Sequence, residues 1–243
     1  MNINFLIPTK NEQPELLRDC IASINSFGAT SKYTYDINVC SPKEVAGLNV
    51  VWHEDKFLRG PLHAFNYLFK NTDGEYVICL VEDHQFVSPF DNAIDFLINE
   101  YSMNTYKICS LSTNDGFPCG LPRRGQRLGS ILNLQEDLPN CQICRFPVAA
   151  RETVNKYLNS YIFHPEFRYH AGDIYLGYYL YMMGEQSREC YTARLKQTQF
   201  SKNAEWECSD CNIAYALIKN FQYGCQDYVN EPDSNLSKSR YSF

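Results

Sequence analysis

The sequence lacks an apolar run of the ~18–20 residues that a membrane-spanning helix needs. It also lacks an excess of basic residues. Its net charge of −6 argues against a protein that binds duplex nucleic acid through phosphate contacts. The first ten residues hold no basic stretch followed by an apolar one, so they do not look like a signal peptide. Together these absences predict a cytoplasmic protein with neither a transmembrane segment nor a nucleic-acid partner.

Several common signatures of chemistry are missing as well. There is no P-loop, no glycine-rich dinucleotide-binding turn and no G-x-S-x-G elbow, and no internal repeat. The eleven cysteines form an odd set without a signal peptide, which favours reduced, buried thiols over a disulfide framework. Two C-x-x-C pairs, Cys141 with Cys144 and Cys208 with Cys211, could hold zinc, although they lie much farther apart than in a compact zinc ribbon.

In the first half of the chain, apolar runs alternate with stripes at helical spacing. The runs predict strands at 4–8, 35–39, 49–52, 76–81 and 107–111. The stripes predict helices at 14–27, from 59–61 to about 69, and at 94–101. Strands that alternate with helices at this pace imply parallel pairing through right-handed crossovers. We therefore expect an α/β fold with a mostly parallel central sheet flanked by helices.

The second half has a different character. Residues 114–142 are rich in glycine and proline and carry a basic group of three arginines, Arg123, Arg124 and Arg127. These arginines could close over phosphates or an acidic acceptor, or they could form an ordinary charged loop. Beyond them we predict a strand and three helices, at 143–148, 154–161, 173–183 and about 209–222. We expect a single domain over residues 1–225 and a polar tail over 226–243.

The segment 75–86 is the most informative part of the chain. An apolar strand at 76–81 is followed at once by Glu82, Asp83 and His84. Ligands of open α/β sheets bind beyond the carboxyl ends of such strands. Two carboxylates and an imidazole at that place indicate a site for a divalent cation and phosphate. The alternative is a polar strand end that is merely exposed to water.

Several motifs occur in a recognisable order. They are Ile7 to Glu12, Arg59-Gly60 through Asn66, Asp73 to Val77, Glu82-Asp83-His84, and His170-Ala171-Gly172-Asp173 before Gly184. This order resembles the family 2 glycosyltransferases of the GT-A fold, over roughly residues 3–184. The resemblance implies a single Rossmann-like GT-A domain, with a nucleotide-sugar-binding half at 1–113 and an acceptor-binding half at 114–225.

The resemblance also implies an activity and a cofactor. The expected activity is metal-dependent, inverting transfer of a sugar from a nucleotide-sugar donor to a hydroxyl of a glycan or other acceptor. The expected cofactor is Mn²⁺ or Mg²⁺, held first by Asp83 and second, directly or through water, by Glu82. His84 as a ligand would favour Mn²⁺; otherwise it is a supporting or surface imidazole. The donor-binding residues implied are Pro8, Thr9, Lys10, Asn11, Glu12, Arg59, Gly60 and Asn66.

The base that accepts the proton of the attacking hydroxyl is implied to be Asp173. This residue begins a predicted helix, so the alternative is that it only caps the helix. His170 and His164 are further candidates for the base, and each could equally be structural.

The sequence departs from the family pattern at three places. The second strand ends in Cys40-Ser41-Pro42 without a carboxylate, Glu-Asp-His replaces Asp-x-Asp, and Gly172 replaces a glutamate. Two other functions therefore stay open. One is a sugar-phosphate nucleotidyltransferase, although the loop after the first strand lacks the glycine-rich basic pattern of that class. The other is a catalytically inactive GT-A-fold binding protein.

Overall fold

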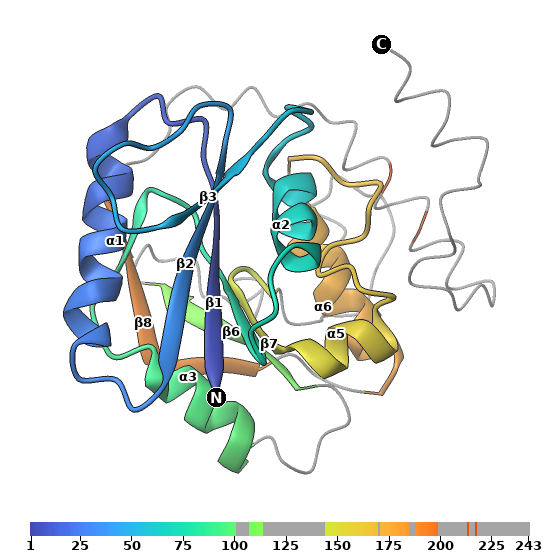
Figure 1. Ribbon diagram of the computed structural model, residues 1–243. Coiled ribbons are helices and arrows are strands. Elements are labelled where there is room, and N and C mark those ends of the chain that lie inside the picture. The colour runs from blue at the N-terminus through green and yellow to red at the C-terminus, as the bar shows by residue number, and fades with distance from the viewer. Residues whose placement is uncertain are drawn as a thin grey trace.

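The computed structural model describes residues 1–100, 107–113, 144–169, 171–184 and 188–198, together with Ile213 and Leu217. Within these residues the strands form one eight-stranded sheet in the order β3-β2-β1-β4-β7-β6-β8-β5. Helices cover both of its faces, with α1 on one side and α2, α5 and α6 on the other (Figure 1). Among the described helices, none combines the length and the apolar character that crossing a membrane requires.

The parallel part of the sheet is built around β1 (Asn2–Pro8). It lies between β2 (Thr34–Ser41) and β4 (Tyr76–Cys79), and β3 (Val51–Glu54) pairs with β2 on the outside. All three of these pairings are parallel, as the alternation of strands and helices predicts. Strands β1 and β4 are apolar at successive positions because both of their faces are covered.

Alternate residues of β1 enter two separate cores. Ile3, Phe5 and Ile7 pack with α1 (Pro14–Gly28) and α3 (Asp91–Asp95), whereas Leu6 packs with the helices on the opposite face. Helix α1 turns one apolar stripe to the sheet, made of Leu17, Cys20, Ile21 and Ile24. Each of the two long N-terminal helices, α1 and α2 (Pro61–Lys70), has a proline in its first turn, where no intrahelical N–H bond is lost.

The second half of the sheet is mixed. β7 (Pro147–Ala150) runs antiparallel to both of its neighbours, β4 and β6 (Ile108–Thr113). Strand β8 (Arg188–Gln197) is parallel to β6 and antiparallel to β5 (His84–Phe86). The expectation of parallel pairing is therefore right for β1 to β4 and wrong for β7.

The remaining helices follow the predicted ones with shifted bounds. A π-helical turn (Phe96–Glu100) continues α3, and α5 (Arg151–Tyr157) begins and ends earlier than its apolar stripe suggests. Helix α6 (Gly172–Met182) is buried along most of its length, as expected of a helix that is apolar all round. Of the helix expected near 209–222, the structure describes Ile213 and Leu217, which are helical and pack against the core.

The six cysteines in the described part of the chain are all free and buried: Cys20, Cys40, Cys79, Cys109, Cys144 and Cys190. Burial raises the pKa of the Cys79 and Cys109 thiols well above their ordinary range, so they stay protonated. Their burial confirms the prediction of reduced core thiols for these six. The other partners of Cys144 in a zinc site, Cys141, Cys208 and Cys211, lie outside the described residues.

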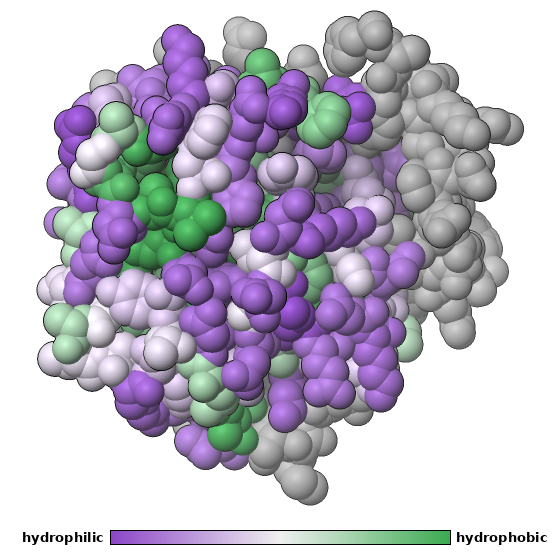
Figure 2. Space-filling model, in the orientation of Figure 1, coloured by the Kyte–Doolittle hydropathy of each residue, from purple (hydrophilic) through white to green (hydrophobic). Residues whose placement is uncertain are grey.

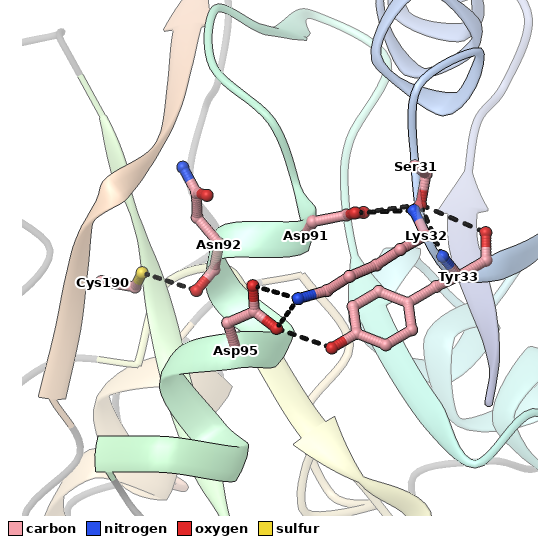
Figure 3. A network of polar contacts seen from close by, with 7 residues as sticks. All are labelled: Ser31, Lys32, Tyr33, Asp91, Asn92, Asp95 and Cys190. Atoms are coloured by element: carbon pink, nitrogen blue, oxygen red, sulfur yellow. Dashed lines mark hydrogen bonds and ion pairs between the residues drawn. The ribbon is translucent and has the colours of Figure 1, made fainter.

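A polar network fastens the turn after α1 to α3 (Figure 3). The carboxylate of Asp91 accepts hydrogen bonds from the Ser31 hydroxyl at 2.6 Å and the Lys32 backbone N–H at 3.0 Å. Asp95 accepts from the Tyr33 hydroxyl at 2.6 Å and pairs with the Lys32 ammonium at 2.7 Å. This network holds β2 and α3, which are distant in sequence, in a fixed relation at the amino end of the parallel strands.

The outer face beside β3 is less polar than the rest of the visible surface. Figure 2 shows a largely hydrophilic surface with an apolar patch between α1 and β3. In the link that joins β2 to β3, Leu48 and Val50 are partly buried against the core, while Val51 at the start of β3 is 49% exposed. At this edge the sheet ends in β3, which has only four residues. A short edge strand exposes few unpaired backbone N–H and C=O groups.

Gly60, which precedes α2, is a position where the backbone leaves no room for a side chain. Its φ is +93°, and a Cβ there would lie 2.4 Å from the carbonyl oxygen of Arg168, which already accepts the Leu62 N–H. We expect Gly60→Ala to lower the free energy of unfolding by about 2–4 kcal/mol, because strain and a backbone clash add together. Gly47→Ala is the matched control, since φ is +76° there with nothing within 4 Å of the new Cβ. It should cost about 1–2 kcal/mol in urea denaturation. If the two substitutions lowered the free energy of unfolding equally, the proposed clash with the Arg168 carbonyl would be contradicted.

Candidate functional site

A cavity of about 950 Å³ opens at the carboxyl ends of the parallel strands. From β1 the chain moves outward to β2 and β3, and then returns across β1 to β4. The strand order therefore reverses between β1 and β4, and the loops that follow these strands diverge and leave a crevice. Pro8, Thr9, Lys10 and Glu12 line the cavity from the loop after β1, and Val81, Glu82 and Asp83 line it from the segment after β4.

Glu82 is a carboxylate in an unfavourable place. Burial raises its pKa to about 7, and the nearby charges of Asp83 and Glu12 act in the same direction. Its Oε2 atom is buried and has no hydrogen-bond partner within the described part of the chain. A carboxylate without donors is costly to bury, so this site favours either a proton or a cation beside Glu82.

Asp83, in contrast to Glu82, has a hydrogen-bond partner at each carboxylate oxygen. Its Oδ1 lies 2.6 Å from Nδ1 of His84, and its Oδ2 accepts a 3.0 Å hydrogen bond from the Gln197 side-chain amide. Burial raises the pKa of Asp83, but the hydrogen bond and charge of His84 and the Gln197 bond outweigh it, so the net shift is downward. Its backbone carbonyl accepts from both the N–H and the hydroxyl of Thr198. Asp83 is therefore a fixed, ionised carboxylate on the cavity wall.

His84 lies behind Asp83 and is not among the residues that line the cavity. Its side chain is 2% exposed, and its ring packs 4.5 Å from the ring of Phe146. No group of three or more His, Cys, Asp or Glu side chains is placed to hold a metal ion within the described residues. Glu82 and Asp83 therefore line the cavity, whereas His84 contacts Asp83 from behind. The structure does not bring Glu82, Asp83 and His84 together as three ligands of one ion.

The Glu82–Asp83 pair nevertheless fits a hard divalent cation. Carboxylate oxygens are the ligands that Mg²⁺ and Mn²⁺ take from proteins, and such ions commonly complete their coordination with phosphate and water. The buried Oε2 of Glu82 is an acceptor that such an ion would satisfy. Two protein carboxylates beside a cavity large enough for a nucleotide are consistent with that arrangement.

The residues expected to contact the donor divide into two groups. Pro8, Thr9, Lys10, Glu12 and Gly60 line the cavity, whereas Asn11, Arg59 and Asn66 do not. Asn11 has a φ of 55° and its N–H bonds the Thr9 hydroxyl at 2.7 Å, so it shapes the turn. Arg59 lies over the ring of Phe57, 5.1 Å from its centroid.

Asn66 is buried, and its side chain is used by the fold. Its Nδ2 donates to the carbonyl of Phe163 at 2.7 Å, and its Oδ1 accepts the N–H of Phe163 at 3.0 Å. A bidentate bond to one peptide unit ties α2 to the segment before α6. This geometry gives Asn66 a structural role and no access to the cavity.

The candidates for the base lie on or before α6. Asp173 is in the first turn of that helix, where its Oδ1 accepts the N–H of Ile174 at 2.9 Å, and it does not line the cavity. Tyr169, four residues earlier, does line it. His170 lies outside the described residues. His164 is buried between Phe167 and Tyr175, and burial lowers its pKa to about 3, which marks it as a core histidine.

Two groups in the site were not predicted. Asp55, just after β3, lines the cavity, and its carboxylate is fixed by the N–H groups of Phe57 and Leu58 at 3.2 and 3.0 Å. Its own N–H bonds the carbonyl of Ser41, so it lies beside the end of β2, where the resemblance places an acidic cluster. Gln197 and Thr198 were missed because β8 was not expected; no signal at 197–198 alone marks them.

Comparisons with known proteins bear on the fold. No family model matches the sequence, and no curated protein matches it. Among solved structures, mannosyl-3-phosphoglycerate synthase from Rubrobacter xylanophilus aligns over 95% of this chain and 77% of its own, with a TM-score of 0.59 and 12% identity. A mannosyltransferase from Pyrobaculum calidifontis, in complex with GDP-Man and Mn²⁺, aligns over 97% and 67%, with a TM-score of 0.54 and 16% identity.

A third structure extends this likeness to a different sugar transferase. The catalytic domain of Drosophila β1,4-galactosyltransferase 7, in complex with xylobiose, aligns over 87% of this chain and 78% of its own, with a TM-score of 0.55 and 13% identity. At such low identity the likeness establishes the fold and leaves the activity to be argued from the site. The chain therefore has the GT-A, Rossmann-like α/β fold that its motif order predicts.

Glu82→Gln tests the electrostatics of the cavity. At pH 8, where Glu82 is mostly ionised, the substitution should raise the unfolding free energy of the metal-free protein by about 1 kcal/mol, because it removes a poorly compensated charge. Mn²⁺ should raise the melting temperature of the wild type and much less that of Glu82→Gln. Glu44→Gln, at an exposed position, is the control and should change neither quantity. If Glu82→Gln lowers the apo stability, the assignment of Glu82 as an uncompensated carboxylate is wrong.

Proposed function

We propose that this protein is a metal-dependent, inverting glycosyltransferase that moves a sugar from a nucleotide-sugar donor to an acceptor hydroxyl. The observation that carries the proposal is the Glu82–Asp83 pair on the wall of the cavity between β1 and β4. The GT-A fold and a structural relative in complex with GDP-Man and Mn²⁺ support it. The acidic pair alone would fit several phosphate-binding reactions, and the fold narrows the choice.

Glu82 and Asp83 would hold a Mn²⁺ or Mg²⁺ ion. When bound, such an ion neutralises the charge that develops on the departing diphosphate. Asp83 supplies a fixed, ionised carboxylate, and Glu82 supplies an acceptor whose unfavourable burial the ion relieves. The two neighbouring carboxylates have opposite pKa shifts because burial dominates at Glu82, whereas the bonds from His84 and Gln197 dominate at Asp83.

The other walls of the cavity suit a diphosphate. Gly60 and Pro61, at the amino end of the ten-residue helix α2, line the cavity, and the positive end of a helix dipole favours an anion there. Lys10, in the loop after β1, also lines the cavity and is exposed, with its ammonium 4.0 Å from the carboxylate of Glu12. The amino end of α2 and the Lys10 ammonium are therefore the groups that we propose to hold the diphosphate of the donor.

The part of the cavity lined by Pro42, Asp55 and Leu58 is the candidate place for the nucleobase. The carboxylate of Asp55 is held by two backbone N–H groups, those of Phe57 and Leu58. A rigid carboxylate accepts hydrogen bonds from the N–H groups of a base. We propose that Asp55, from the loop after β3, replaces the acidic cluster that is missing at Cys40-Ser41-Pro42.

The reaction also needs a base on the side of the sugar opposite the leaving group. It takes the proton of the acceptor hydroxyl as that oxygen attacks the anomeric carbon, through a transition state with oxocarbenium character. Asp173 remains our candidate, because Tyr169 lines the cavity and the short segment that follows leads to Asp173 at the start of α6.

The proposal is tested with purified protein, Mn²⁺ or Mg²⁺, and a panel of UDP-, GDP-, CDP- and dTDP-sugars. We expect one donor class to be hydrolysed slowly without acceptor, and its nucleoside diphosphate to raise the melting temperature only when the metal is present. Pyrophosphate release from a nucleoside triphosphate and a sugar phosphate would instead identify a nucleotidyltransferase. If no donor reacts and no nucleotide binds, the enzymatic proposal fails.

Asp173→Asn separates chemistry from binding. The side chain keeps its size and an oxygen that can accept the Ile174 N–H, so the fold of α6 should be preserved. We expect donor binding to change less than threefold and turnover to fall by about 10²–10⁴-fold, as for loss of a general base. Isothermal titration and a transfer assay measure the two quantities. Equal losses of binding and turnover would show that Asp173 is only structural.

A further inference from the structure

The carboxylate of Asp83 is held from behind at both oxygens. His84 Nδ1 lies 2.6 Å from Oδ1, and the Gln197 amide donates to Oδ2 at 3.0 Å. Both holding residues come from the antiparallel pair of β5 and β8, in which His84 lies directly opposite Gln197. A carboxylate has about four acceptor positions, so two remain for a ligand in the cavity.

The imidazole of His84 is an unexpected group for its surroundings. It is 2% exposed, it packs on Phe146, and its Nε2 is buried without a hydrogen-bond partner among the described residues. A buried polar atom left unpaired costs about 1–3 kcal/mol. An aromatic hydrocarbon of similar shape would avoid that cost at Nε2 but would lose the bond to Asp83. Packing against Phe146 alone therefore does not explain a histidine at this position, and the bond to Asp83 is the interaction that requires its ring.

The direction of the hydrogen bond follows from the groups around Asp83. Its other oxygen accepts from the Gln197 amide, and a carboxylate oxygen can only accept. The proton of the 2.6 Å bond therefore belongs to His84 Nδ1, and Nε2 is the ring atom left without a partner among the described residues.

We propose that His84 is a positioning residue, whose Nδ1–H holds the Asp83 carboxylate, together with Gln197, in the orientation that offers its free lone pairs to a divalent cation in the cavity. This inference rests on the proposed function, because it assumes that Asp83 binds the cation. Supporting hydrogen bonds of this kind fix the direction of a ligand and raise metal affinity. In this role His84 acts through Asp83 and does not itself coordinate the cation.

The backbone around Asp83 is fixed independently of His84. The Thr198 N–H and hydroxyl both bond the Asp83 carbonyl, at 2.9 and 3.0 Å. The β5–β8 pairing adds hydrogen bonds that do not involve the imidazole. Replacing the ring should thus free the Asp83 carboxylate without moving its main chain, which makes substitution a clean test.

The test compares His84→Phe with His84→Asn. Phenylalanine preserves the ring and removes both nitrogens, whereas asparagine can place its amide donor near the position of Nδ1. Mn²⁺ binding is measured by titration calorimetry with UDP and with GDP present. We expect His84→Phe to remain folded while its Mn²⁺ dissociation constant rises 10- to 100-fold. His84→Asn should stay within about threefold of the wild type.

The outcomes separate this inference from the proposed function. If the wild type fails to bind Mn²⁺ both in the presence of UDP and in the presence of GDP, the proposed function and the positioning role of His84 both fail. If the wild type binds and His84→Phe binds equally well, or if His84→Asn loses as much as His84→Phe, the positioning role alone is wrong. Should His84→Phe not fold, Gln197→Met removes the other donor to Asp83. It should weaken Mn²⁺ binding by about 3- to 10-fold, and unchanged binding would overturn the proposal.

Discussion

The structure depends on the parallel pairing of β1 with β4. The residues of β1 lie in two cores, and the chain reverses its direction across the sheet at this strand, so the loops after β1 and β4 must diverge. That divergence opens the cavity, which Thr9, Lys10 and Glu12 line together with Glu82 and Asp83. Gly60 lets α2 begin at the same opening, because only a residue without Cβ can pass so close to the carbonyl of Arg168.

Two adjacent carboxylates with different surroundings, Glu82 and Asp83, determine the chemistry of the site. Asp83 is paired at both oxygens and stays charged, while Glu82 is partly buried near other acids and keeps one oxygen unpaired. The first provides rigidity and the second provides a strong preference for a positive partner. His84 contributes to this arrangement from inside the protein, where its unpaired Nε2 is a cost to stability that a function of the site would offset.

The sequence predicted best where burial forces a simple pattern. The apolar runs of β1 and β4 and the stripe of α1 could be recognised because both strand faces, or one helix face, are covered. Strand β8 was missed because its buried residues Cys190, Ala193 and Leu195 do not keep a period of two, in line with the break in its register against β6. Strand β5 was missed because three residues show no period. These two strands supply Gln197 and fix His84. The sequence could therefore single out the two carboxylates that line the cavity, and it offered a supporting imidazole as one alternative for His84. It could not indicate Gln197 or Asp55, because their positions beside the cavity depend on tertiary structure.

The central claim is that Glu82 and Asp83 bind a divalent cation that also contacts a nucleotide diphosphate. Anomalous diffraction at the manganese edge, from crystals grown with Mn²⁺ and the nucleoside diphosphate that stabilises the protein, tests it most directly. The account predicts one anomalous peak within about 2.5 Å of a carboxylate oxygen of Glu82 or Asp83, with diphosphate density in contact with it. Nucleotide density in the cavity with no manganese peak beside these two residues would contradict it.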